Sequence, residues 1–143
     1  MSRRKARESA LQMLFQLTVG ENDWQAAEET LAEAAVSEAN AGFAREVVRG
    51  AMEKTAELDT LINRFSKQWQ VERLANVDKT VLRLALYELK YMPQTDAPIV
   101  INEAVTLAKI FGTEDSGAFV NGMLDAIYNQ VLKPEAQTEN NAV

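Results

Sequence analysis

The sequence predicts an all-α fold, a single compact bundle of long helices. Its 143 residues include only 3 prolines and 6 glycines, too few turn-forming residues for the many short strands of a β fold. Apolar side chains instead recur at intervals of three and four residues, which is the spacing of amphipathic helices. With 47% hydrophobic and 25% charged residues, a chain of this length can bury one core of its own.

The first helix is expected over residues 3–19, because its apolar side chains fall on one arc at 100° per residue. The opposite arc is polar and carries little charge. Such an arc suits hydrogen bonding to bases and phosphates, and it suits plain exposure to water equally well. The residues on this arc are Lys5, Ser9, Gln12 and Gln16.

Two helices and a connection are expected next. An Ala- and Glu-rich outer helix is predicted over residues 24–39, and a long helix capped by Asn40 is predicted to continue to residue 65. Gly50 in the middle of this long helix indicates a close helix crossing, because glycine costs about 1 kcal/mol there relative to alanine. Residues 66–76 are expected to form a connection with at most one short helical turn.

The central helix is expected over residues 77–91, capped by Asn76, because it is apolar over most of its circumference. Asp96 is expected to cap the next helix, over residues 97–111. Gly112 fits a left-handed position that would end this helix.

A last helix is expected from residues 113–116 to residue 132, with Pro134 as its stop. The tail over residues 135–143 is polar and acidic, and we expect it to be disordered. No repeat or linker divides residues 1–134, so these form a single domain.

The chain contains no cysteine and no histidine. It therefore has no disulfide or thiolate metal site, and it lacks the side chain used most often for acid–base catalysis and metal binding. We expect no catalytic residue, no metal and no cofactor, and hence a protein that is not an enzyme. No apolar stretch reaches 18 residues and no signal peptide is evident, so we expect a cytoplasmic protein without a membrane partner.

Positive charge is concentrated at the N-terminus. Four of the 15 basic residues, Arg3, Arg4, Lys5 and Arg7, precede the first acidic residue, Glu8. The remaining 11 basic residues face 21 acidic ones, so a segment of charge +4 precedes a body of charge −10. This pattern is typical of localised contact with nucleic acid, although a solubilising terminus would look the same.

Several motifs occur in an order that resembles the NusB family. They are RRKARE at residues 3–8, VDKTVLRLALYEL at 77–89, INEAV at 101–105, FG at 111–112 and FVNGMLD at 119–125. The resemblance extends over about residues 3–132. It implies a bundle of about seven helices in two subdomains and a function without catalysis.

The resemblance also implies partners. NusB-like proteins pair with NusE, a small-subunit ribosomal protein, and the pair binds the single-stranded boxA element of nascent RNA, notably in ribosomal RNA leaders. Together with other Nus factors, it modifies RNA polymerase so that transcription resists Rho-dependent termination.

By position, the resemblance assigns two RNA-binding patches and one surface for NusE. The first patch consists of the arginine-rich motif, one amide residue and one aromatic residue that could stack on a base. The second patch lies at the start of the last helix. Some relatives carry a basic residue where this chain has Gly117-Ala118, which weakens the second patch. The RNA-binding residues are Arg3, Arg4, Lys5, Arg7, Gln12, Phe15, Asp115 and Phe119, and the NusE-facing acids are Glu72 and Asp78.

Four basic side chains neutralise three or four phosphates. The salt slope, which is the change of log K for RNA binding with log salt concentration, would then be about −2 to −3 on a single strand. The acidic body repels further RNA. We therefore expect weak, salt-sensitive binding alone and stronger binding with a partner.

Two alternatives remain open at this point. The chain could be a pure protein-interaction module, such as a homodimer that buries the amide face of the first helix without binding specific RNA. A NusB-like domain also precedes some ribosomal RNA cytosine methyltransferases, but we expect no methyl-donor domain in these 143 residues.

Overall fold

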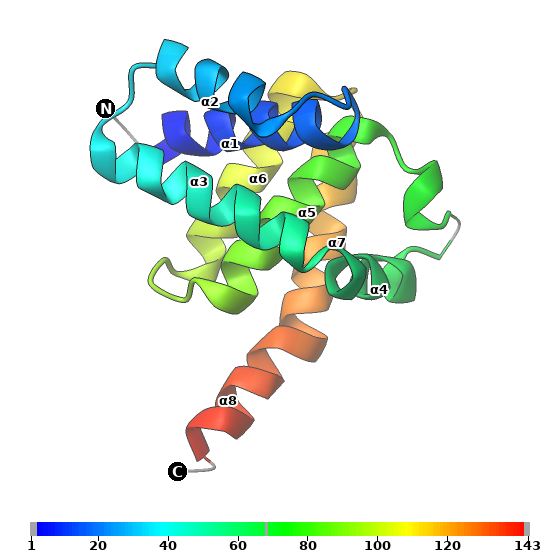
Figure 1. Cartoon of the computed structure of the whole chain (residues 1–143). Helices are drawn as coiled ribbons and strands as arrows, with labels where there is room; N and C mark the ends of the chain where they lie inside the picture. Colours follow the sequence, from blue (N-terminus) through cyan, green and yellow to red (C-terminus); the bar gives the residue numbers. More distant parts are fainter. Residues whose placement is uncertain (1–2, 68, 142–143) are drawn as a thin grey trace.

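The computed structural model describes residues 3–67 and 69–141, and every regular element within these ranges is helical (Figure 1). The predicted all-α class is therefore confirmed. None of the described helices is long and apolar enough to cross a membrane.

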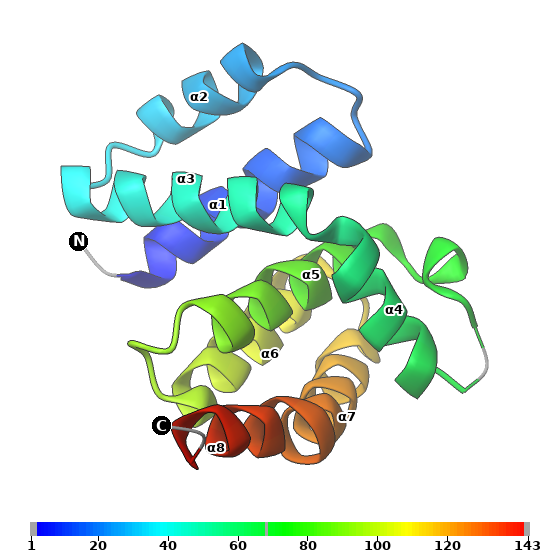
Figure 2. The ribbon, with the colours of Figure 1, turned by 60° about the horizontal axis from the view of Figure 1, so that its bottom comes forward.

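The helices form two groups (Figure 2). The N-terminal subdomain consists of α1 (Arg3–Thr18), α2 (Trp24–Glu33) and α3 (Glu38–Glu53). The C-terminal subdomain begins with α4 (Thr55–Phe65), a short 3-10 turn η1 (Val71–Arg73), α5 (Asn76–Tyr91) and α6 (Ala97–Phe111). It ends with α7 (Ser116–Ile127), the π-helical segment η2 (Tyr128–Leu132) and α8 (Lys133–Asn141). Because α7, η2 and α8 are continuous, the described chain has seven helices, the number expected.

The N-terminal subdomain is held together by the apolar face of α1, which packs against α2 and α3. The small residues Ala6 and Ala10 and the larger Met13 and Leu14 are almost completely buried. Asp23 caps α2, because its carboxylate accepts a hydrogen bond from the Ala26 amide at 3.0 Å. The buried arc of α1 therefore follows the predicted periodicity.

The predicted helix over residues 24–39 is wrong at its C-terminal end. The helix stops at Glu33, and Ala35 takes a left-handed conformation with φ of 53°. Ser37 then caps α3, because its hydroxyl accepts a hydrogen bond from the Asn40 amide at 3.2 Å. Asn40 is not the cap but a buried residue in the first turn of α3. The break lies in an alanine-rich stretch without glycine or proline, so local propensity gave no signal for it.

The long helix predicted over residues 40–65 is two helices that meet at Lys54. The Thr55 hydroxyl donates to the carbonyls of Ala51 and Met52, at 2.9 and 3.0 Å, and so closes the end of α3. The turn allows α3 to pack against α1 while α4 packs against α7, and both contact α5. Tertiary contacts rather than a helix-breaking residue set this boundary.

The predicted central helix is confirmed, because α5 packs against α1, α3, α4, α6 and α7. Its expected cap, however, is wrong. Asn76 lies within α5 and does not cap it, and Ala75 at the cap position offers no side-chain hydrogen bond. At the start of α6, Asp96 occupies the cap position, but its side chain makes no capping bond.

Gly112 ends α6 as expected but not in the expected conformation. Its φ is −99°, outside the left-handed region. A Cβ atom at this position would lie 2.4 Å from the Ser116 Oγ and 2.7 Å from the Ala108 carbonyl oxygen. Glycine is required here by the close approach of α7, not by a left-handed turn.

Pro134 does not stop the last helix, contrary to the prediction. The π-helical turn η2 precedes it, and this wider turn moves backbone carbonyls away from the proline ring, which would clash in a regular α-helix. The disordered acidic tail expected over residues 135–143 coincides largely with α8, which extends past the bundle (Figure 1). Residues 142–143 lie outside the described residues.

Gly50 marks a close contact between α3 and α5, as its place in the sequence predicted. A Cβ atom on Gly50 would lie 1.9 Å from Cζ of Tyr87, whose ring also stacks on Tyr91 with centroids 5.0 Å apart. Gly42, in the same helix, has open space around its would-be Cβ. The two glycines therefore have opposite structural requirements.

We predict that Gly50→Ala lowers the free energy of unfolding by about 1 to 3 kcal/mol, because the Tyr87 ring must leave its site. The control Gly42→Ala should raise it by about 0.5 to 1 kcal/mol through helix propensity alone. Urea denaturation followed by circular dichroism measures both. Equal changes in the two variants would contradict the packing assigned to Gly50.

Candidate nucleic-acid interface

The exposed face of α1 carries four of the expected RNA-binding residues. Arg4, Lys5 and Gln12 are exposed and Phe15 is half-buried. At 100° per residue these four positions fall on one side of the helix, opposite the arc that packs into the core. We call them the basic face. Its combination of cations, an amide and an aromatic ring fits contacts to phosphates and bases.

The polar arc expected on α1 is only partly exposed. Ser9 is buried, and the Gln16 side-chain amide donates to the Thr30 hydroxyl of α2 at 2.7 Å. The helix α2 therefore covers one half of that arc. Lys5 and Gln12 form the half that remains open.

Arg4 forms a two-point ion pair with Glu103 of α6. Its Nε and Nη2 donate to the two carboxylate oxygens at 2.9 and 3.1 Å, and these hydrogen bonds raise the pKa of Arg4. The Arg4 side chain still keeps 57% of its surface exposed. A phosphate can therefore reach Arg4, but it must compete with a carboxylate that already holds it.

Arg3 and Lys5 are held more loosely. The Arg3 guanidinium lies over the Phe43 ring, 4.4 Å from its centroid, and the Lys5 ammonium lies 3.7 Å from a carboxylate oxygen of Glu8. Exposed contacts of this kind contribute little energy and leave the cations free to move. These side chains can turn to a ligand at small cost.

Arg7 lies in the core and not on the RNA-binding surface that its position in the motif suggested. Its Nε and Nη2 donate to Glu88 of α5 at 3.0 and 2.6 Å, and only 8% of the residue is exposed. Its guanidinium also lies 5.3 Å from the centroid of the Phe43 ring. The burial of Arg7 could have been predicted from the sequence. Arg7 precedes the core residue Leu14 by seven positions, so both residues lie on the same face of the helix.

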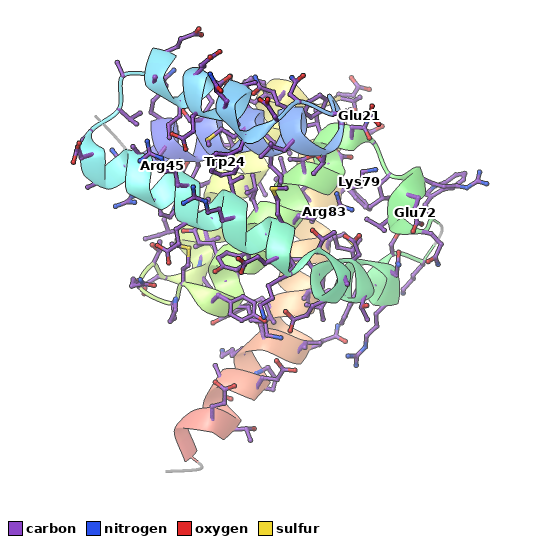
Figure 3. The ribbon with its side chains drawn as sticks, in the orientation of Figure 1. Glu21, Trp24, Arg45, Glu72, Lys79 and Arg83 are labelled. Atoms are coloured by element: carbon purple, nitrogen blue, oxygen red, sulfur yellow. The ribbon has the colours of Figure 1, made fainter. Side chains whose placement is uncertain are left out.

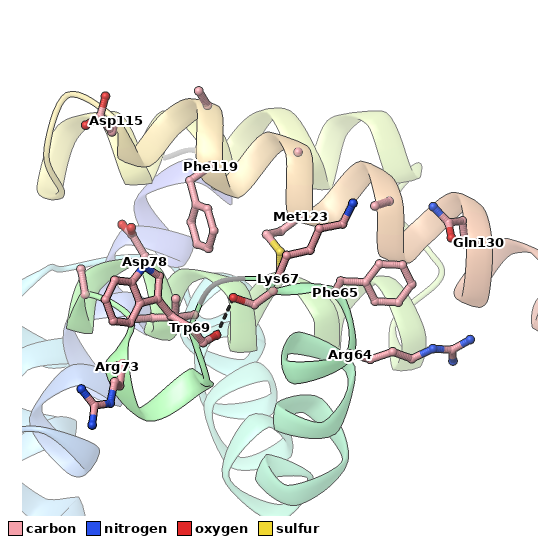
Figure 4. A pocket seen from close by; sticks show the side chains of 16 residues that line it. Arg64, Phe65, Lys67, Trp69, Arg73, Asp78, Asp115, Phe119, Met123 and Gln130 are labelled. Atoms are coloured by element: carbon pink, nitrogen blue, oxygen red, sulfur yellow. Dashed lines mark hydrogen bonds between the residues drawn. The ribbon is translucent and has the colours of Figure 1, made fainter.

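The second expected patch lies along a groove of about 1080 Å³, which we call the α7 groove. Figure 4 shows Phe119 projecting from α7 towards the side where Asp78 of α5 and Trp69 lie. Asp115 is exposed at the N-terminal end of α7, and Phe119 is half-buried. The structure thus brings Asp115 and Phe119 together with Asp78, although these residues were assigned to different ligands.

Glu72, the other acid expected to face NusE, is exposed on η1 (Figure 3). It follows the connection that borders the α7 groove but is not among the residues that line it. Glu72 and Asp78 therefore lie on neighbouring elements with different surroundings.

Sequence reasoning missed four residues of the α7 groove. The sequence predicts only a connection with at most one short helical turn after α4, yet Trp69 exposes 53% of its surface there. Three basic residues, Arg64, Lys67 and Arg73, line the same groove. A tryptophan between basic residues in a connection was the available signal, because a buried tryptophan would normally belong to a helix face.

The fold and these two surfaces define a helical binding protein. Within the described ranges no three acidic side chains gather to hold a metal ion. The family model for NusB matches residues 4–129. The chain therefore belongs to the NusB family of transcription antitermination proteins, which is not a family of enzymes.

Individual relatives support this assignment. The chain is 44% identical over 129 residues to the transcription antitermination protein NusB of Desulforamulus reducens, and the match covers 87% of each protein. T. maritima NusB is similar with a TM-score of 0.81 at 35% identity, covering 94% of this chain and 96% of that chain. A structure of the antitermination factors NusB and NusE in complex with double-stranded RNA gives a TM-score of 0.79 at 30% identity, covering 89% and 96%.

We predict that Arg7→Glu lowers the free energy of unfolding by about 3 to 5 kcal/mol, because it leaves two carboxylates facing each other in the core. The double variant Arg7→Glu/Glu88→Arg should recover a large part of that loss. Thermal denaturation of the three proteins tests the pair. If Arg7→Glu were as stable as the wild type, Arg7 would not be the buried partner of Glu88.

Proposed function

We propose that this chain binds boxA-type single-stranded RNA in ribosomal RNA leaders as a complex with NusE. With RNA polymerase and other Nus factors, the complex helps transcription in the cytoplasm to resist Rho-dependent termination. Residues 1–134 would form the RNA-binding domain. The observation that carries the proposal is the basic face of α1, which presents Arg4, Lys5, Gln12 and Phe15 together in a member of this family.

The side chains on the basic face favour a single strand. Phe15 offers an aromatic ring and Gln12 an amide, and both act on bases whose faces and edges are accessible. Bases inside an A-form duplex are stacked, and its deep major groove does not admit side chains. An unpaired segment can place its bases against both residues while its phosphates meet the cations.

Electrostatics favours binding with a partner. With Arg7 buried, three cations near the N-terminus remain to meet phosphates, so their share of the salt slope is about −2. The rest of the chain carries excess negative charge, which repels additional RNA. A basic ribosomal protein such as NusE supplies the missing positive surface, and Glu72 supplies an exposed acid for it to meet, whereas Asp78 is almost completely buried.

We predict that Arg4→Glu/Lys5→Glu weakens binding of a fluorescein-labelled boxA RNA by at least about tenfold in the presence of NusE. The two lost phosphate contacts should also make the salt slope shallower by about 1.4. Fluorescence anisotropy at several salt concentrations measures both quantities. Circular dichroism should be unchanged, because neither residue is buried.

The matched control is Lys54→Glu/Lys133→Glu, which changes the net charge equally on exposed residues outside the basic face. It should leave the affinity within about threefold, the small effect expected of distant charges in salt. Equal losses in both variants would mean that net charge alone governs binding. No loss in either variant, with light scattering showing a dimer that excludes RNA, would favour the protein-interaction alternative.

A further inference from the structure

We propose that the α7 groove is a base-binding subsite in which one unstacked base with an exocyclic amine rests on Trp69 and donates to Asp78. The proposal rests on the proposed RNA-binding function and adds to it a residue that selects the base. It extends the patch expected at Asp115 and Phe119 to side chains that no motif indicated.

Trp69 provides a surface on which a base can stack. More than half of its surface is exposed, although an indole of this size is usually packed in a core. The connection that carries it is fixed at two points. The Ser66 hydroxyl donates to the Trp69 carbonyl at 2.6 Å, and the Val71 amide donates to the Asn63 side-chain oxygen at 2.7 Å. An aromatic ring on a fixed backbone loses little entropy when a base stacks on it.

Asp78 provides an unused hydrogen-bond acceptor at the same groove. Only 9% of the residue is exposed, and its Oδ1 has no hydrogen-bond partner among the described residues. A buried polar atom without a partner is costly, so a ligand that donates to it gains affinity. A carboxylate accepts from an exocyclic amine, as of cytosine or adenine, and repels the carbonyl O4 that uracil presents at the equivalent position.

Three cations line the same groove and can meet the phosphates. Arg64, Lys67 and Arg73 line the groove, and none of them has a carboxylate partner within the described ranges. Several other basic side chains are held by an acid of a neighbouring helix, for example Arg45 by Glu28 at 2.8 Å. Unlike Arg4 and Arg7, the three cations of the groove can turn to a phosphate without leaving a carboxylate.

The charges in the groove favour a nucleic acid over a basic peptide. The three cations outnumber the two acids, Asp78 and Asp115, so a lysine- or arginine-rich segment would be repelled overall. Aromatic rings, cations for phosphates and a single buried acceptor are the elements of a single-strand binding site.

The test uses the full chain with NusE and a set of boxA RNAs, each with one abasic nucleotide. Trp69→Ala should weaken binding of the intact RNA by about tenfold, the effect of losing one stacked base, and Trp69→Phe by less than about threefold. For one RNA in the set, Trp69→Ala should cause no further loss, which identifies the nucleotide in the groove. The control Met52→Ala removes an exposed apolar side chain from α3 and should bind normally.

At the nucleotide so identified, the wild type should bind RNA with uracil about tenfold more weakly than RNA with the preferred base. Asp78→Asn should reduce this difference to less than about threefold, because the side-chain amide can donate to the O4 carbonyl of uracil. Asp125→Asn, an exposed acid outside the groove, should leave the discrimination intact. Circular dichroism and the affinity for NusE without RNA are measured for every variant.

Three results would overturn the proposal. Trp69→Ala could bind like the wild type, it could weaken all abasic RNAs equally, or it could weaken NusE binding without RNA to the same extent. The last result would make the groove a protein-docking surface. If Arg4→Glu/Lys5→Glu still weakens RNA binding as predicted above, only the subsite fails, whereas the proposed function fails if that variant also binds normally.

Discussion

The buried ion pair between Arg7 of α1 and Glu88 of α5 determines how the first helix lies on the bundle. Both side chains are almost completely buried, and two hydrogen bonds join them across the boundary between the subdomains. A pair of this kind is costly to break, because either partner alone would leave an uncompensated charge in the core. With Arg7 fixed inward, helical periodicity turns Arg4, Lys5, Gln12 and Phe15 outward, so the basic face depends on a residue that is not part of it.

Acids of the body also hold the cations that remain at the surface. Glu103 binds Arg4 and Glu8 lies near Lys5, so a phosphate that binds α1 replaces a carboxylate instead of meeting a free charge. Exchange of this kind lowers affinity for RNA in general and leaves selectivity to the contacts that bases make. The α7 groove differs, because its cations have no carboxylate partner among the described residues and its aromatic residue is exposed. Weak general binding by α1 would explain why a partner is needed, and the proposed base-binding subsite would add selectivity.

Much of the fold could be predicted because helical periodicity is a local property. The ranges of α1 and α6 and the central place of α5 follow from apolar spacing. The breaks at Ala35 and Lys54 and the continuation through Pro134 could not be predicted, because packing partners and a π-helical turn set them. At the site, charge clustering found the basic face but not the burial of Arg7, which depends on Glu88, 81 positions away. Trp69 was missed because an exposed position in a connection has no periodic pattern.

If RNA binds α1 as proposed, it takes the cations of this helix from carboxylates of the body. The most direct measurement is the boxA RNA affinity of Glu103→Gln in the presence of NusE. The control is Glu28→Gln, which removes the acid of α2 that pairs with Arg45 of α3 and leaves the cations of α1 untouched. We expect Glu103→Gln to bind the RNA about threefold more tightly at low salt, with a gain that fades as salt rises, and Glu28→Gln to be unchanged. Weaker or unchanged binding by Glu103→Gln would contradict this expectation.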